Sequence, residues 1–215
     1  MPRFVTIITG SPASLLRFGT IWFSPVMKQQ FLQSHGWHQP EWWSSARDDP
    51  VWPWLTDEGS LTAKLRKWAG EHLRLVPFME VHTAFDSDDM RFLGSSTSVA
   101  GLRREVAFFS ESEPWVFAST LIPDETLKEE PWLVHLGTTP LGDRLFGEKR
   151  GQRIRLEIAQ IRTGHPLYEA SRCQLGRLPT WFWARRSLFR VGHHSLIVQD
   201  GFIGFRAPWR GTSIL

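Results

Sequence analysis

The sequence predicts an α+β domain in which a single antiparallel β-sheet has helices packed on one face. Several stretches alternate polar and apolar residues with the period of a strand, and two pairs of them are separated only by short turns. The few helical stretches are grouped rather than alternating with the strands, which favours antiparallel pairing over βαβ units. With 215 residues, 41% of them hydrophobic, the chain suits one domain with a proper core.

The first 50 residues are rich in tryptophan and in residues that break regular structure, as in HGWHQPEWWSSARDDP. We expect residues 1–50 to form an arm of uncertain order and residues 51–215 to form the domain. A helix is predicted soon after the boundary, with Ser60 as its N-cap and Gly70 at its end. Its apolar face recurs at helical spacing: Leu61, Leu65 and Trp68.

The remaining elements follow in order along the chain. RLVPFMEVHTAF is predicted to be extended, and the acidic DSDD after it to be a solvated turn. LRREVAFF and PWVFASTLI form one predicted hairpin, joined by SESE; ARRSLFRV and SLIVQDGFI form another, with its turn at residues 192–194. Between the hairpins we expect a short helix in ETLKEEPWLVHLG, a loop at LGTTPLG and a strand at RIRLEIAQI.

The charge pattern narrows the class of partner. The 25 lysines and arginines are scattered along the chain against 22 acidic residues, which favours small anions over nucleic acid. The lone cysteine, Cys173, cannot form an internal disulfide, as expected of a protein in the reducing cytoplasm. FVTII is too short for an export signal, and no window approaches the ~20 apolar residues of a membrane span. We therefore expect no membrane insertion.

Two charged residues share a strand face with apolar neighbours. Arg104 shares its face with Val106 and Phe108. Asp200 shares its face with Leu196, Val198 and Phe202. Such residues are seldom buried unless they are paired or bind a ligand. One interpretation is a buried ion pair or an exposed strand end. The other is an apolar cavity in which Arg104 holds an anion and Asp200 contacts a hydroxyl and handles a proton.

Other candidates are weaker. Ser119 is a polar residue on the strand face of Phe117 and Leu121, but it lacks the G-x-S-x-G context of a hydrolase nucleophile. His193 and His194 lie in a predicted turn without a third spaced ligand, so no metal site is predicted. LGTTPLG lacks the lysine and the glycine spacing of nucleotide-binding loops.

Taken together and in order, GSLTAKL, REVAFFSESEPWVFASTLIP, LGTTPLGDRLF, WARRSLFRV and VQDGFI resemble the chorismate lyase family over residues 54–203. The resemblance implies a monomeric antiparallel sheet with helices on one side and a buried, lidded site that needs no metal or organic cofactor. It also implies the conversion of chorismate to 4-hydroxybenzoate and pyruvate, the first step of ubiquinone biosynthesis in many bacteria.

The resemblance assigns roles to five residues. The arginine that binds the ring carboxylate falls on Arg104, and the carboxylate that meets the 4-hydroxyl falls on Asp200. Leu141 in the TPLG loop and Leu61 after the serine N-cap correspond to apolar contacts of the site. Ser119 stands where the family has a second arginine that engages the substrate region.

Two of these positions depart from the family pattern. Asp200 replaces a glutamate, and Ser119 carries no charge, so the enolpyruvyl carboxylate of chorismate needs another partner. The candidates are backbone donors or one of three arginines: Arg103, Arg185 and Arg186. The rival hypothesis is a non-catalytic protein that binds small aromatic acids on the same fold.

Overall fold

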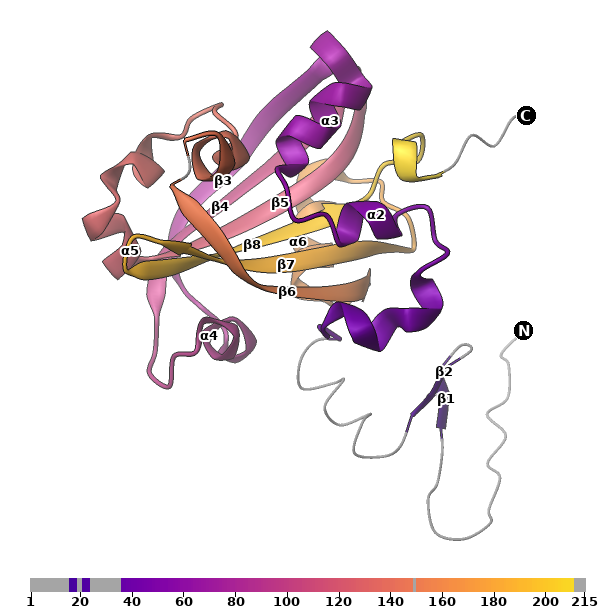
Figure 1. Ribbon diagram of the computed structural model, residues 1–215, viewed down its shortest axis with the longest axis horizontal. Helices are drawn as coiled ribbons and strands as arrows, with labels where there is room; N and C mark the ends of the chain where they lie inside the picture. Colours follow the sequence, from indigo (N-terminus) through magenta and orange to yellow (C-terminus); the bar gives the residue numbers. More distant parts are fainter. Residues whose placement is uncertain (1–15, 19–20, 24–35, 149, 211–215) are drawn as a thin grey trace, which may run out of the picture.

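The structure is a computed structural model that describes residues 16–18, 21–23, 36–148 and 150–210 (Figure 1). Two short strands near the N-terminus, β1 (Leu16–Phe18) and β2 (Ile21–Phe23), pair antiparallel. The other described strands form one six-stranded sheet in the order β3-β4-β5-β8-β7-β6, and each neighbouring pair is antiparallel. The predicted α+β class with its antiparallel sheet is therefore confirmed.

Both predicted hairpins are confirmed, and they meet at the centre of the sheet, where β5 pairs with β8. Glu111 in the first turn and Gly192 in the second have positive φ angles of 56° and 58°, as tight hairpin turns require. The six strands are β3 (Leu73–Ala84), β4 (Ala100–Ser110), β5 (Glu113–Pro123), β6 (Gly151–Arg162), β7 (Trp181–Val191) and β8 (His194–Phe202).

The predicted helix after the serine N-cap is α3 (Leu61–Ala69). Ser60 Oγ accepts a hydrogen bond from the backbone N–H of Ala63 at 3.2 Å, and Gly70 ends the helix with a φ of 56°. The other α-helices are α2 (Trp52–Leu55), α4 (Ser87–Leu93), α5 (Asp124–Glu129) and α6 (Pro166–Leu175). Short turns of other helix types are η1 (Pro40–Ala46), η2 (Gly70–His72), η3 (Pro131–His135), η4 (Asp143–Gly147) and η5 (Pro208–Arg210).

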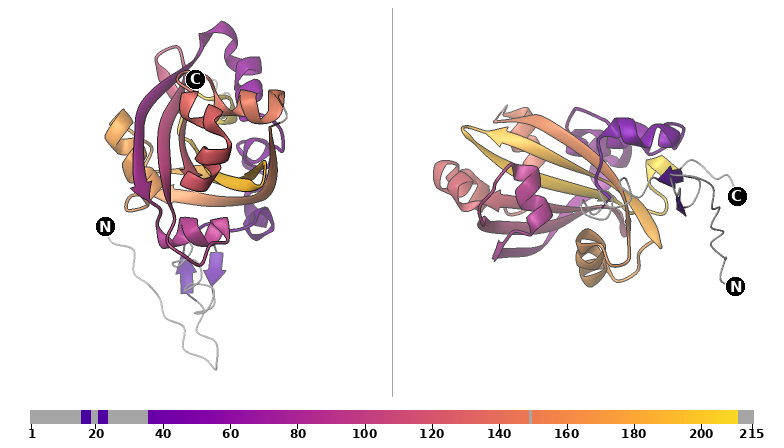
Figure 2. Two further views of the ribbon diagram at one scale, coloured as in Figure 1. Left: turned by 90° about the vertical axis from the view of Figure 1, so that its left-hand side faces the viewer. Right: turned by 90° about the horizontal axis from the view of Figure 1, so that it is seen from below.

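Helices lie against both faces of the sheet, whereas one face was expected (Figure 2). On the side called here the α3 face, α2, α3 and the segment 131–147 pack on apolar residues of the strands. On the opposite side, the α6 face, α6 and α4 cover Phe117, Leu121 and their neighbours. The physical reason is that the central strand β5 is buried at successive positions along its length, so both of its faces need a cover.

The predicted apolar face of α3 is correct at two of its three positions. Leu61 and Leu65 are buried, but Trp68 is 64% exposed and Ala69 is buried in its place. Residues 61, 65 and 69 are each four apart and lie on one line along the helix, which leaves Trp68 at the edge of this face. Its ring instead lies 6.3 Å from that of Trp54, centroid to centroid.

The predicted acidic turn at residues 86–89 is wrong, because these residues begin helix α4. The Asp86 side chain caps the helix by accepting hydrogen bonds from the backbone N–H groups of Asp88 and Asp89. Asp88 and Asp89 are only 3% and 4% exposed. Carboxylates in the first helical turn are stabilised by the helix dipole, and Arg186 on β7 supplies the opposite charge.

Part of the expected N-terminal arm is packed against the sheet. Trp43 is buried and its indole N–H donates to the Ile158 carbonyl at 2.8 Å. Asp49 Oδ2 accepts a 3.0 Å hydrogen bond from the indole N–H of Trp183 on β7. Residues 36–50 are thus continuous with the domain, and residues 1–15, 19–20 and 24–35 of the expected arm lie outside the described residues.

Candidate active site

A cavity opens on the α3 face, between the sheet and the segments that cover it. It contains about 520 Å³ of space free of protein atoms, part of it open to solvent. Most of its lining is apolar, and its four charged side chains come from four different strands. The lining residues are Leu61, Thr62, Leu75, Arg104, Val106, Phe108, Ala118, Thr120, Leu141, Gly142, Leu145, Phe146, Arg153, Arg185, Phe189, Val198 and Asp200.

Arg104 reaches the cavity from β4 and is only 1% exposed. Its Nε donates to Glu80 Oε1 at 3.0 Å, and its Nη2 donates to the Gly137 carbonyl at 2.6 Å. Burial lowers the pKa of the Arg104 guanidinium, and the hydrogen bond with Glu80 only partly offsets that effect. The group is therefore a desolvated cation in a fixed orientation, which is the form that binds a carboxylate strongly.

Asp200 on β8 lies directly opposite Arg185 on β7 in the strand register. Arg185 Nε donates to Asp200 Oδ2 at 2.9 Å, and both side chains are almost completely buried. Arg185 Nη1 also donates to two backbone carbonyls, those of Trp54 at 3.0 Å and Asp57 at 3.2 Å. These contacts fix the carboxylate of Asp200 in the cavity wall.

A third guanidinium, that of Arg153, lines the cavity from β6. Its Nη1 donates to the Asp57 carbonyl at 2.8 Å, and the group lies over the rings of Phe189 and Phe146, 5.1 and 5.7 Å from their centroids. Its Nε is buried and has no hydrogen-bond partner among the described residues. Burial, reinforced by the neighbouring positive charge of Arg185, lowers the pKa of Arg153 to about 10.

The covering segments contribute the apolar groups that the sequence predicts. Leu61 is the first residue of α3, and Leu141 precedes η4, so both lie at the ends of short helices over the sheet. A side chain at Gly142 would come within 2.9 Å of Thr62 Oγ1, so the two segments approach each other closely at this point. The structure thus brings Leu61 and Leu141 together with Arg104 and Asp200.

Ser119 does not belong to this cavity, contrary to the expectation that it occupies the same site. Ala118 and Thr120 line the cavity, and Ser119 between them lines a second, smaller pocket on the α6 face. The reason is the alternation of a strand: Arg104 is paired in register with Thr120, and Ser119 is paired with Glu105. Ser119 is 3% exposed.

The other arginines proposed as partners divide between the two faces. Arg185 lines the cavity but is already paired with Asp200. Arg103 lines the pocket on the α6 face, and Arg186 binds carboxylates there. The sequence interpretation missed Arg153, because in RIRLEIAQI the alternation places it with Arg155 and Glu157 on the polar face. A β-bulge between Arg153 and Arg155 reverses that assignment, and no residue pattern in the strand announces it.

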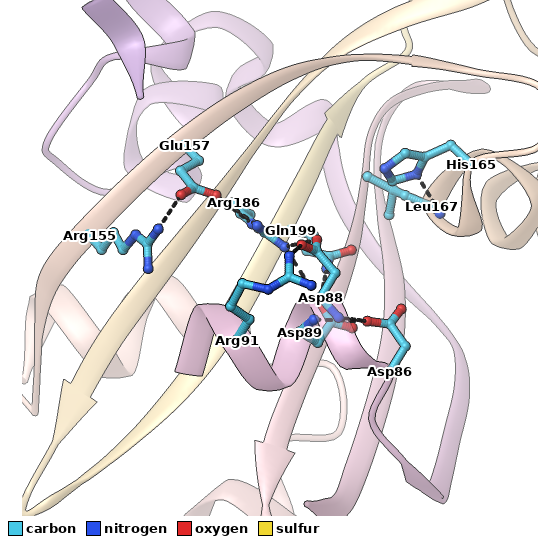
Figure 3. A network of polar contacts seen from close by, with 10 residues as sticks. All are labelled: Asp86, Asp88, Asp89, Arg91, Arg155, Glu157, His165, Leu167, Arg186 and Gln199. Carbon is cyan, nitrogen blue, oxygen red and sulfur yellow. Dashed lines mark hydrogen bonds and ion pairs between the residues drawn. The ribbon is translucent and has the colours of Figure 1, made fainter. Parts of the chain in front are cut away.

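A network of buried charges holds helix α4 against the α6 face (Figure 3). Arg186 Nη1 donates to Asp88 Oδ2 at 2.6 Å, and Arg186 Nε and Nη2 donate to Glu157 Oε2 at 2.9 and 2.8 Å. Asp89 Oδ1 accepts from Gln199 Nε2 at 2.9 Å. The network joins α4 to the strands β6, β7 and β8.

Asp89 makes the stability of this face depend on pH. Burial and the nearby Asp86 raise the pKa of Asp89 to about 7, against the opposing effects of Arg186 and Arg103. The folded chain therefore keeps a proton on Asp89 between about pH 4 and 7, where the unfolded chain has lost it. Each pH unit in that window lowers the free energy of unfolding by about 1.4 kcal/mol as the pH rises.

We expect Asp89→Asn to remove this dependence, because asparagine keeps the acceptor for Gln199 without the charge. Urea unfolding at pH 5 and pH 8 measures it: the variant gains stability relative to the wild type at pH 8, by up to a few kcal/mol. Parallel curves for the two proteins over this range would contradict the prediction.

The described residues include no group of three or more histidine, cysteine, aspartate or glutamate side chains that could hold a metal ion. His194, from the turn weighed above as a ligand, lies 3.1 Å from the Glu129 carboxylate through its Nε2. Within the described part of the chain, no helix is long and apolar enough to cross a membrane.

Comparison with known proteins identifies the family of this chain. The family described as chorismate lyase matches residues 31–208. The probable chorismate pyruvate-lyase of Pseudomonas putida is 34% identical over 151 residues, which cover 70% of this chain and 79% of that protein. The protein of the same name from Coxiella burnetii (strain RSA 493 / Nine Mile phase I) is 35% identical over 151 residues, covering 69% and 80%. The chain belongs to the chorismate lyase family.

The fold is also found in a solved structure of low sequence similarity. The effector domain of PhnF from Mycobacterium smegmatis superposes with a TM-score of 0.51 at 15% identity, covering 70% of this chain and 91% of that one. This likeness concerns the fold alone.

Proposed function

We propose that the protein is a lyase that converts chorismate to 4-hydroxybenzoate and pyruvate. The observation that carries the proposal is the convergence, in one largely apolar cavity, of three guanidinium groups and one carboxylate: Arg104, Arg153, Arg185 and Asp200. Chorismate combines two carboxylates, one hydroxyl and an apolar ring, so it requires cations, one hydrogen-bond acceptor and apolar walls. The names of the related proteins support the same activity.

In this proposal the ring carboxylate binds Arg104 and the 4-hydroxyl donates to Asp200. The two residues lie on β4 and β8, which are separated by β5, so they approach the ring from different strands. Val106 and Phe108 on β4, with Leu61 and Leu141 from the cover, enclose the ring. Enclosure excludes water and strengthens each polar contact inside the cavity.

The chemistry is an elimination that forms an aromatic ring. The bond between ring carbon 3 and the ether oxygen breaks, the proton on ring carbon 4 leaves, and its electron pair completes the ring. The departing enolate of pyruvate takes up one proton on its methylene carbon, which balances the proton lost from ring carbon 4, and becomes pyruvate. The protein orients the substrate and guides proton movement, and no covalent intermediate is needed. Arg185 is a positioning residue here, since it acts through Asp200.

The family resemblance also leads us to propose a pathway, an oligomeric state and a cellular compartment for the protein. The 4-hydroxybenzoate would enter ubiquinone biosynthesis, and the protein would act as a monomer in the cytoplasm without a metal or organic cofactor. Sedimentation of the purified protein tests the monomer, and supply of 4-hydroxybenzoate to a strain lacking the protein tests the pathway.

The decisive experiment is to incubate the purified protein with chorismate and to measure both products by chromatography, beside a sample without protein. We expect 4-hydroxybenzoate and pyruvate to appear in equal amounts and faster than in the blank. A protein that binds 4-hydroxybenzoate but leaves chorismate at the blank rate would instead be a non-catalytic binder of small aromatic acids.

Substitution of Asp200 tests the hydroxyl contact. We expect Asp200→Asn to lower kcat/KM about ten- to hundred-fold, because it removes a charged acceptor and leaves Arg185 buried without its partner. Asp200→Glu, the matched control, keeps the charge and should retain most of the activity. Steady-state kinetics of both variants decide the point, and full activity in Asp200→Asn would exclude Asp200 from the reaction.

A further inference from the structure

The charges in the cavity do not balance. Arg185 pairs with Asp200 at 2.9 Å, and Arg104 pairs with Glu80 at 3.0 Å. Arg153 forms no ion pair with any carboxylate among the described residues, although it lines the same cavity. One of the three guanidinium groups therefore has no direct ion-pair partner, and the carboxylates of Asp200, Asp57 and Glu58 act on it only at longer range.

The surroundings of Arg153 make this lack of a partner costly. Its Nη1 is satisfied by a backbone carbonyl, but its Nε is buried without an acceptor. Phe189 and Phe146 lie beside the group, so cation–π contacts hold it in place. The rings offer no strong hydrogen-bond acceptor. A buried cation with an unused donor is destabilising unless a ligand completes it. The ligand that would complete it is an anion, and a carboxylate matches the donor geometry of arginine.

The position of Arg153 relative to the other polar groups fits the substrate. Strands β4 and β6, which carry Arg104 and Arg153, are four interstrand steps apart, about 19 Å along the sheet at about 4.8 Å per step. Long side chains reaching inward from both strands take up much of that distance. Asp200 lies midway, on β8. In chorismate the 4-hydroxyl lies across the ring from the ring carboxylate and next to the enolpyruvyl group, so a hydroxyl bound at Asp200 leaves the enolpyruvyl group free to extend toward β6.

We propose that Arg153 binds the enolpyruvyl carboxylate of the substrate. The inference rests on the proposed function and deepens it, because it assigns each carboxylate its own arginine. Arg103 and Arg186 are excluded from the role since they serve the α6 face. Arg153 distinguishes substrate from product: 4-hydroxybenzoate has no second carboxylate, so it leaves this contact unused.

The test compares two unreactive ligands by calorimetry, one with and one without the second carboxylate. They are 3-(carboxymethoxy)-4-hydroxybenzoate and 4-hydroxybenzoate. Arg153→Gln should weaken the dicarboxylate at least about tenfold and change the Kd of 4-hydroxybenzoate by no more than about twofold. Arg153→Lys, which keeps the charge but not the fork of donors, should fall in between. The matched control is Arg190→Gln, an exposed arginine on the neighbouring strand β7, which should leave both affinities unchanged.

Equal losses for the two ligands would show a structural role, and unchanged binding of the dicarboxylate in Arg153→Gln would also overturn the proposal. The KM for chorismate gives a second readout and should rise in Arg153→Gln. The calorimetric measurements separate this inference from the lyase proposal. If Arg153→Gln weakens only the dicarboxylate, and the wild type does not turn over chorismate, the subsite is supported and the lyase is rejected. Turnover with an unaltered KM in Arg153→Gln supports the lyase and rejects the subsite.

Discussion

Replacement of Arg104 by alanine should abolish most of the turnover of chorismate, with kcat/KM reduced about 100-fold or more. The side chain is 1% exposed and its guanidinium is held by Glu80 and the Gly137 carbonyl, so it meets a ligand without first having to be ordered. Alanine removes the cation and leaves the ring carboxylate desolvated beside apolar walls. Initial rates at several chorismate concentrations measure the loss.

Arg103→Gln is the matched control for this experiment. Arg103 is the neighbouring residue on β4 and points to the α6 face, so it has the same charge and nearly the same position in the chain but no access to the cavity. We expect its kcat/KM to stay within about twofold of the wild type. Equal activity in Arg104→Ala and in the wild type would remove Arg104 from the site and with it the proposed orientation of the substrate.

Much of the fold could be predicted because polar and apolar residues alternate regularly along most of the strands. LRREVAFF and PWVFASTLI show the period of a strand and are separated by a short polar turn, and they form β4 and β5 almost residue for residue. The helix α3 could likewise be predicted from its N-cap serine and the glycine at its C-terminal end. The acidic start of α4 was missed, because a run of aspartates looks solvated until the buried arginine that neutralises it is known.

Residues of the candidate site could be predicted only on strands whose polar and apolar residues alternate regularly. Arg104 and Asp200 stand out since each interrupts an apolar face, and the structure places both in one cavity. Ser119 was grouped with them because of the family resemblance, whereas the register between β4 and β5 places it on the opposite face of the sheet from Arg104. Arg153 was hidden by a bulge, which moves a side chain to the other face without changing the residue pattern.

The charge network on the α6 face should contribute more to stability than any surface contact of the chain. Arg186 is 3% exposed and is the cation shared by Asp88 and Glu157, at 2.6 and 2.8 Å. Arg186→Leu keeps apolar volume but removes the buried cation that Asp88 and Glu157 share, and it leaves them with their exposed partners Arg91 and Arg155. Breaking a buried pair in this way costs about 3–5 kcal/mol. We expect a loss of that size in the free energy of unfolding, measured by urea denaturation at pH 7.5.

Arg155→Leu is the comparison that shows how much the burial of an ion pair, rather than its charge alone, contributes to stability. Arg155 also pairs with Glu157, at 2.6 Å, but its side chain is 42% exposed, so water screens the contact and its loss should cost no more than about 1 kcal/mol. Because Arg186 anchors Asp88 at the start of α4, its replacement should also speed amide hydrogen exchange in residues 87–93 ahead of the rest of the domain. Similar losses in the two variants, with uniform exchange, would mean that the network stabilises the fold no more than an exposed ion pair does.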